Sequence, residues 1–116
     1  MRVIGFSGYS GSGKTTLVEQ VIARLRLAGQ RVSVVKHAHH DFDIDHPGKD
    51  SHRHRGAGAF EVVIASDRRL AKIREFEVRT DPTVHQLIAE LYDCDWVLVE
   101  GFKHADVLKI EVWRAE

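Results

Sequence analysis

The chain has 116 residues, of which 43% are hydrophobic and 29% are charged, a composition typical of a soluble globular domain. Its 17 basic residues balance 17 acidic ones, so the net charge gives no reason to expect a nucleic-acid partner. The apolar runs are too short to cross a bilayer, and the N-terminus does not resemble a signal peptide, which together predict a cytoplasmic protein with no membrane partner. The only cysteine is Cys94, so an intrachain disulfide is excluded.

Strand and helix patterns alternate along the chain. In order, they predict a strand over 2–6, a helix over 15–28, a strand over 32–35, a loop over 36–49, a helix from 50 or 51 to about 58, strands over 60–65 and 70–76, a helix over 82–92 capped by Asp81, and strands over 96–99 and 107–113. Strands that are apolar on both faces favour a mostly parallel sheet with helices on both sides. The polar turn 66–69 predicts one antiparallel hairpin added to that sheet. We therefore expect a single α/β domain over 1–116, a Rossmann-like fold of three layers.

The segment between the first strand and the first helix, 8–15, matches the phosphate-binding pattern G-x-x-x-x-G-K-[ST] at every position. Glycines let the backbone turn its N–H groups toward an anion, and the start of the helix adds the positive end of its dipole. Lys14 is expected to reach the β- and γ-phosphates, Thr15 to bind Mg²⁺ and Thr16 to contact the α-phosphate. The predicted nucleotide-binding residues are Ser10, Gly11, Ser12, Gly13, Lys14, Thr15 and Thr16. A glycine-rich turn without a ligand is the alternative.

Glu100 follows the apolar run 96–99, which places it at the carboxyl edge of the predicted sheet, where open α/β sheets bind ligands. An acidic residue there can hold Mg²⁺ through water or orient an attacking water, so we predict a catalytic and metal-binding role for Glu100. The alternative is an ordinary surface glutamate at the end of a strand.

Histidines and aspartates crowd the loop that follows the second strand, among them His37, His39, His40 and three aspartates, Asp41, Asp43 and Asp45. Three interpretations are open. The segment can be a solvated charged loop, or a transition-metal site, because imidazoles and carboxylates are ordinary ligands of zinc and nickel. In the third, one or more of Asp41, Asp43 and Asp50 complete the Mg²⁺ and phosphate site, and we predict a catalytic and metal-binding role for Asp41 on this basis.

Three segments together resemble the MobB family, the molybdopterin-guanine dinucleotide biosynthesis adapter proteins. They are Gly8 to Thr16, the K-H-A-H-H-D run over 36–41 with P-G-K-D-S over 47–51, and V-E-G-F-K-H over 99–104. The first segment is common to many nucleotide-binding families, whereas the second and third together are distinctive. The resemblance extends over essentially the whole chain.

The resemblance implies a GTP-binding P-loop protein of the SIMIBI class that uses Mg²⁺, hydrolyses GTP weakly and forms a homodimer. Its implied partners are the molybdopterin guanylyltransferase and molybdopterin or its guanine dinucleotide. The implied function is to assist the attachment of GMP to molybdopterin. Family members continue beyond the end of this chain, so we expect the domain to be truncated at its C-terminus.

Preference for guanine cannot be read from the chain itself. The sequence has no asparagine, so it lacks the N-K-x-D motif by which many GTPases read guanine, and GTP preference follows from the resemblance alone. Two other functions remain open: a metallochaperone-type GTPase that carries nickel or zinc on His37, His39 and His40, and a small-molecule kinase that uses Asp41 or Glu100 as base.

Overall fold

The computed structural model describes residues 1–8, 13–38, 50–102 and 106–112. The chain divides into two compact units, one formed by Met1–His39 with Pro82–Glu116 and the other by His40–Asp81. Each unit has its own sheet, and the two are described separately. Within the described residues, no helix is both long enough and apolar enough to span a membrane.

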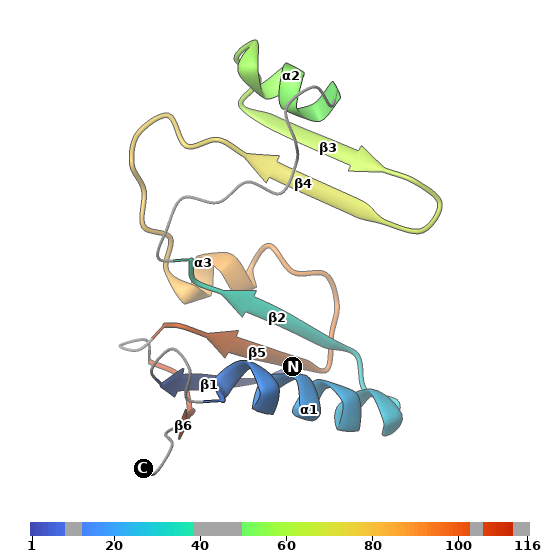
Figure 1. The fold of residues 1–116 in the computed structure, drawn as a ribbon, viewed down its shortest axis with the longest axis vertical. Coiled ribbons are helices and arrows are strands. Elements are labelled where there is room, and N and C mark those ends of the chain that lie inside the picture. Colours follow the sequence, from blue (N-terminus) through green and yellow to red (C-terminus); the bar gives the residue numbers. More distant parts are fainter. Residues whose placement is uncertain (9–12, 39–49, 103–105, 113–116) are drawn as a thin grey trace. The chain divides into compact units, whose positions relative to one another are not determined.

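The first unit is built on a four-stranded sheet (Figure 1). Its elements are β1 (Arg2–Gly8), α1 (Lys14–Leu27), β2 (Val32–Lys36), α3 (Val84–Ile88), β5 (Trp96–Glu100) and β6 (Lys109–Val112). The strands lie in the order β2-β5-β1-β6, and every neighbouring pair is parallel. This arrangement confirms the predicted α/β fold with a mostly parallel sheet.

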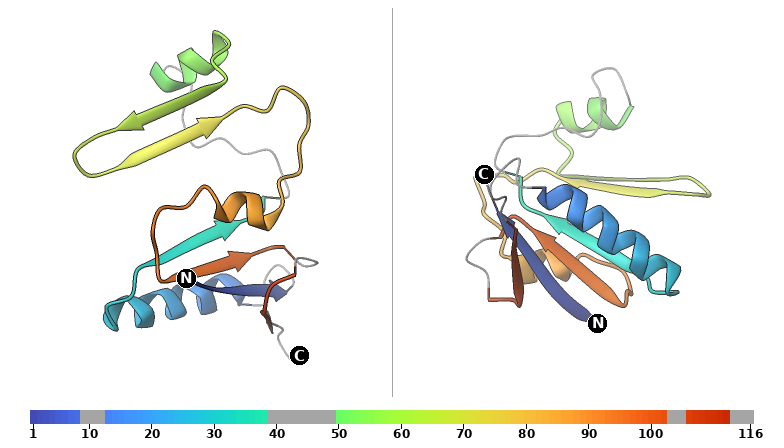
Figure 2. Two further views of the ribbon diagram at one scale, coloured as in Figure 1. Left: turned by 180° about the vertical axis from the view of Figure 1, so that it is seen from behind. Right: turned by 60° about the horizontal axis from the view of Figure 1, so that its bottom comes forward.

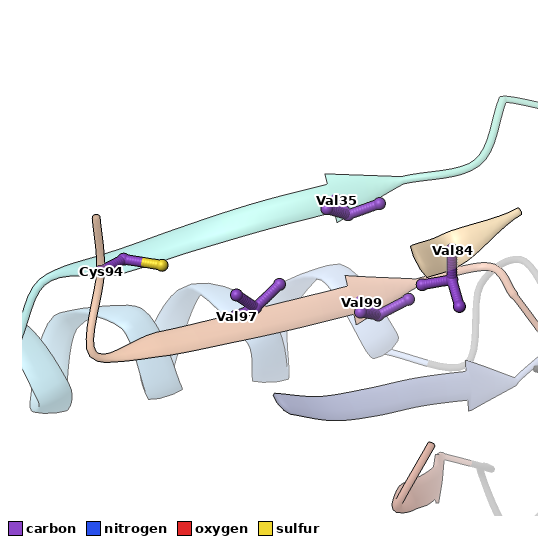
Figure 3. Close-up of a cluster of buried hydrophobic side chains, with 5 residues drawn as sticks. All are labelled: Val35, Val84, Cys94, Val97 and Val99. Atoms are coloured by element: carbon purple, nitrogen blue, oxygen red, sulfur yellow. The ribbon is translucent and has the colours of Figure 1, made fainter. Parts of the chain in front are cut away.

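Both faces of this sheet are covered, because the side chains of β5 alternate between two hydrophobic clusters. Val97 and Val99 pack with Val35 of β2 and Val84 of α3 on one face (Figure 3). Leu98, between them in sequence, packs on the other face with Phe6 and with Val18 of α1. Figure 2 shows α1 running along the strands that it covers. Helices therefore lie on both faces, as predicted from strands without a polar side.

The second unit contains α2 (Asp50–Gly56) and an antiparallel pair, β3 (Glu61–Ala65) and β4 (Leu70–Arg74). The predicted hairpin is confirmed, but its expected place was wrong, since β3 and β4 form a two-stranded sheet of their own. The physical reason lies in charged residues such as Glu61, Lys72 and Arg74, which suit strands exposed on one face and not strands buried on both.

The predicted start and end of the third helix were also wrong. Its N-cap is Thr83 and not Asp81, because the Thr83 hydroxyl accepts a bond from the Gln86 N–H at 3.1 Å while the Gln86 side chain accepts from the Thr83 N–H at 2.8 Å. This reciprocal capping box satisfies two backbone donors at once. The helix ends at Ile88, after which the N–H groups of Glu90 and Leu91 bond three residues back. The expected last turn is thus present as tighter, non-α turns.

Candidate phosphate and magnesium site

The segment predicted to bind phosphate lies between β1 and α1, and the structure describes its two ends. Gly13 is the N-cap of α1 and has the left-handed backbone of φ 94°, which glycine adopts without strain. It supplies no capping side chain, and the first intrahelical bond runs from Leu17 N–H to Gly13 C=O at 3.0 Å. The amides of the first helical turn therefore have no capping side chain from Gly13, which suits an anion placed on the helix axis. Ser10, Gly11 and Ser12 lie outside the described residues.

Two further residues of the predicted cradle, Lys14 and Thr16, lie in the first turn of α1. The Lys14 ammonium donates to the Gly8 carbonyl oxygen at 3.4 Å, so the lysine folds back over its own turn. Thr16 is exposed, and the described part of the chain gives its side chain no hydrogen bond. The predicted phosphate contacts of Lys14 and Thr16 remain predictions.

Thr15 and Glu100 are brought together by the fold although they are far apart in sequence. The Thr15 hydroxyl donates to Glu100 Oε1 at 3.2 Å. Glu100 is only 7% exposed and is the one buried charged residue of the described part. A buried carboxylate is costly unless its oxygens have partners, so this contact stabilises the site without a ligand. A hydroxyl and a carboxylate are also the oxygen donors that Mg²⁺ prefers, so the pair fits the predicted ion.

The backbone around Glu100 is held from the β2 side. The β5 strand pairs with β2 in register up to Lys36 and Glu100, and the next residue, His37, donates its N–H to the Glu100 carbonyl at 3.0 Å. Gly101 follows with φ +95°, and a Cβ there would lie 3.3 Å from the His37 carbonyl oxygen. This position therefore needs glycine for both conformation and space.

Phe102 is a residue of this edge that was given no role from the sequence. Its ring lies 4.9 Å from the His37 ring, centroid to centroid, with the planes 37° apart. It also packs against the hydrophobic cluster of Val97 and Val99. Because aromatic pairs add to the burial of their own surface, the two rings help to join the ends of β2 and β5. The aromatic position directly after the Glu-Gly pair was the only available signal in the sequence.

The histidines and aspartates predicted to form a site after β2 are not brought together by the described part of the structure. His39, His40, Asp41, Asp43 and Asp45 lie outside the described residues, so the structure does not place them. Asp50 lies in the other unit, at the start of α2, and is exposed. Across the described ranges, no group of three or more histidine, cysteine, aspartate or glutamate side chains is arranged to hold a metal. The roles proposed for these loop residues stay predictions.

The family model and the curated relatives that match the chain point to the same family. Residues 3–116 match the family model described as "MobB: Molybdopterin guanine dinucleotide synthesis protein B". The chain is 41% identical over 115 residues to the molybdopterin-guanine dinucleotide biosynthesis adapter protein of Escherichia coli (strain K12). It is 44% identical over 117 residues to the protein of the same description in Haemophilus influenzae. These alignments cover 97% and 98% of the chain but 65% and 64% of the relatives, so the chain spans just under two-thirds of their length.

Solved structures agree with the sequence comparison. A crystal structure of molybdopterin-guanine biosynthesis protein B superposes with a TM-score of 0.73 at 34% identity, covering 94% of this chain and 67% of the other. The crystal structure of Bacillus subtilis MobB gives a TM-score of 0.81 at 25% identity, covering 100% of this chain and 70% of the other. The match over nearly every residue, in sequence and in fold, shows that the chain belongs to the MobB family.

Proposed function

We propose that the protein is a GTP-binding accessory factor of molybdenum cofactor biosynthesis that assists the attachment of GMP to molybdopterin. The observation that carries this proposal is the Thr15–Glu100 contact beside the uncapped start of α1, because it puts oxygen ligands for a cation next to amides suited to phosphate. The names of the relatives supply the pathway. The arrangement of the site supports the ligand class in this proposal, a nucleoside polyphosphate with Mg²⁺.

Each part of the site has a task in this proposal. Amides of the β1–α1 turn bind the phosphate chain, and Lys14 leaves the Gly8 carbonyl to reach the β- and γ-phosphates. Thr15 gives its hydroxyl to Mg²⁺, with Glu100 holding the ion through water. When bound, Mg²⁺ neutralises charge on the phosphate oxygens.

Hydrolysis should be slow. The residues described around the site include no glutamine to orient water and no arginine at the carboxyl edge, the two groups on which fast nucleotide hydrolases depend. Glu100 can orient a water molecule, and Asp41, which lies outside the described residues, is a second candidate acid for this role. We infer a weak GTPase in which nucleotide binding and docking to the guanylyltransferase, as a homodimer, are the main tasks. Molybdopterin or its guanine dinucleotide is the further ligand in this proposal.

The first test removes the ammonium of the cradle. Lys14→Ala should weaken Mg-GTP binding about a hundredfold or more, because the lysine makes charge-assisted bonds to two phosphates at roughly 1.5–3 kcal/mol each. Arg26→Ala is the matched control, since this exposed cation lies in the last turn of the same helix. Calorimetry measures the affinities and circular dichroism checks the fold. A Lys14→Ala protein that binds Mg-GTP like its parent would show that the cradle assignment is wrong.

A competition panel tests the nucleotide and the pathway. GTP, ATP and molybdopterin-containing ligands should be compared on the same protein against a fluorescent guanine nucleotide. We expect GTP to compete best and ATP to compete poorly. Equal competition by ATP would leave the phosphate site intact but remove the guanine part of the proposal. Transfer of labelled γ-phosphate to a metabolite instead of water would favour the kinase alternative.

A further inference from the structure

Lys36 is the last residue of β2 and stands at the same carboxyl edge as the proposed site. Its register partner on the central strand is Glu100. Partners in a parallel pair point to the same face, and the neighbouring pair Val35 and Val99 shares the cluster on the α3 face. Lys36 and Glu100 therefore project on the opposite face, toward the start of α1. Adjacent strands lie about 4.8 Å apart, so Lys36 is next to the proposed metal site.

The side chain of Lys36 has no task in the folded protein that the structure reveals. It is exposed, and among the described residues it makes neither a hydrogen bond nor an ion pair. The nearby Glu100 carboxylate accepts from Thr15 instead. Lysine and glutamate that served only to neutralise each other would be expected to form a direct pair across the two strands.

The charges at this edge favour an anion. Four described side chains lie at the carboxyl edge on the α1 face: the ammonium groups of Lys14 and Lys36, the hydroxyl of Thr15 and the carboxylate of Glu100. Two positive charges stand against one negative charge, and the dipole of α1 adds to the positive side. An anion bound at this edge would balance the excess.

The position of Lys36 is fixed by its neighbours. The His37 N–H bond to the Glu100 carbonyl, at 3.0 Å, continues the β2–β5 pairing past Lys36. The His37–Phe102 ring contact lies just beyond it. A cation on such a rigid strand end loses less conformational freedom on binding than one in a loop, so its backbone is already placed for a ligand.

We propose that Lys36 binds the terminal phosphate of a nucleoside triphosphate and thereby makes the site prefer triphosphates to diphosphates. The strand order β2-β5-β1 places Lys36 beyond Glu100 from the β1–α1 turn. A phosphate chain that starts at this turn and passes the Thr15–Glu100 pair brings its last phosphate to the β2 side. The inference rests on the proposed nucleotide site, and it adds a contact that distinguishes the bound states of that site.

The experiment compares two ligands on four proteins by calorimetry with Mg²⁺ present. The ligands are GDP and the β,γ-imido analogue of GTP, which is not hydrolysed. The proteins are the parent, Lys36→Gln, Lys36→Arg and Arg26→Gln, the last being a control that removes an exposed cation at the far end of α1. Lys36→Gln should lose about ten- to a hundredfold in affinity for the triphosphate, as expected for a charge-assisted bond. Its GDP affinity should stay within about twofold, and Lys36→Arg should retain most of the triphosphate affinity.

The outcomes distinguish a failure of the role proposed for Lys36 from a failure of the proposed nucleotide site. Unchanged triphosphate affinity in Lys36→Gln, or equal losses for both ligands, overturns the role of Lys36. If Lys14→Ala loses both ligands in that case, the proposed nucleotide site stands without Lys36. A parent protein that binds neither ligand overturns the nucleotide site together with this inference.

Discussion

The two units of the molecule use different forces to hold their sheets. In the first unit, the central strand β5 is buried over Val97–Glu100, and all the buried hydrophobic residues of the described chain belong to this unit. In the second unit, no described residue from Asp50 to Asp81 is buried, and Val63 and Leu70 are 56% and 66% exposed. Its strands are joined by backbone pairing and by polar contacts such as the ion pair between Arg74 and Glu61 at 2.8 Å.

Because the two units differ in burial, we expect them to suit different roles. A sheet buried on both faces holds side chains at fixed positions, which is what a phosphate and metal site needs. A two-stranded hairpin with exposed apolar residues is marginally stable on its own and opens readily. We therefore expect substitutions in the first unit to change global stability, and substitutions in the second to change local opening.

The largest contrast should come from removing the same number of carbons in each unit. Leu98→Ala takes three carbons from a side chain that is 1% exposed, and should lower the free energy of unfolding by about 2–5 kcal/mol. Ile64→Ala, in β3 at 43% exposure, should cost less than about 1 kcal/mol. Native-state hydrogen exchange in urea, followed at the amides of β5 and of β3, measures both. Equal losses would contradict the difference in burial between the units.

A smaller contrast should appear between two glycines with positive φ. Gly101→Ala combines φ +95° with a Cβ placed 3.3 Å from the His37 carbonyl, and should cost about 1–3 kcal/mol. Gly58→Ala, at φ +113° in the second unit, has the strained backbone but nothing within 4 Å of the added carbon. Thermal unfolding should therefore show the larger loss for Gly101. In that variant the Mg²⁺ dependence of nucleotide binding should also weaken, because Glu100 is the preceding residue.

The smallest effect is expected at the ion pair of the hairpin. A double-mutant cycle with Arg74→Ala and Glu61→Ala should give a coupling free energy of about 0.2–1 kcal/mol, because both side chains are about a third exposed, at 35% and 29%. Hydrogen exchange of the β3 and β4 amides is the measurement, since the pair joins these two strands. The coupling should fall in 1 M salt, where charges are screened beyond about 3 Å. A coupling that is large and insensitive to salt would mean that the hairpin is less exposed than its side chains indicate.

The order of apolar and polar residues predicted most helices and strands of the fold, because it depends directly on which faces of each element are buried. The run Trp96–Glu100 has no polar residue before its last position, a pattern typical of a strand covered on both faces. The strand order could not be predicted, because nothing in the sequence of β5 states that it lies between β1 and β2. The cap of α3 was wrong because Asp81 and Thr83 both suit an N-cap, and only the reciprocal bond with Gln86 decides between them.

The candidate site, like the fold, was predicted from the sequence only in part. The spacing of Gly8, Gly13 and Lys14 lies within one short segment, so the sequence alone was enough to predict a phosphate cradle there, and this remains a prediction. Glu100 could be placed at the correct edge of the sheet, but its bond to Thr15 depends on how β5 packs beside β1. The ring contact between His37 and Phe102 was not foreseen, because it joins two strand ends whose adjacency is a property of the whole sheet.

The place of β5 in the sheet has a consequence for how the protein is made. Residues 2–6 are synthesised well before residues 96–100, which are their hydrogen-bonded neighbours in the sheet. The first strand and the lysine that follows it must wait, unpaired, until residues 96–100 have been translated. The contact between Thr15 and Glu100 can therefore not form until residue 100 has been synthesised, and pairing over so long a separation is expected to make folding slow.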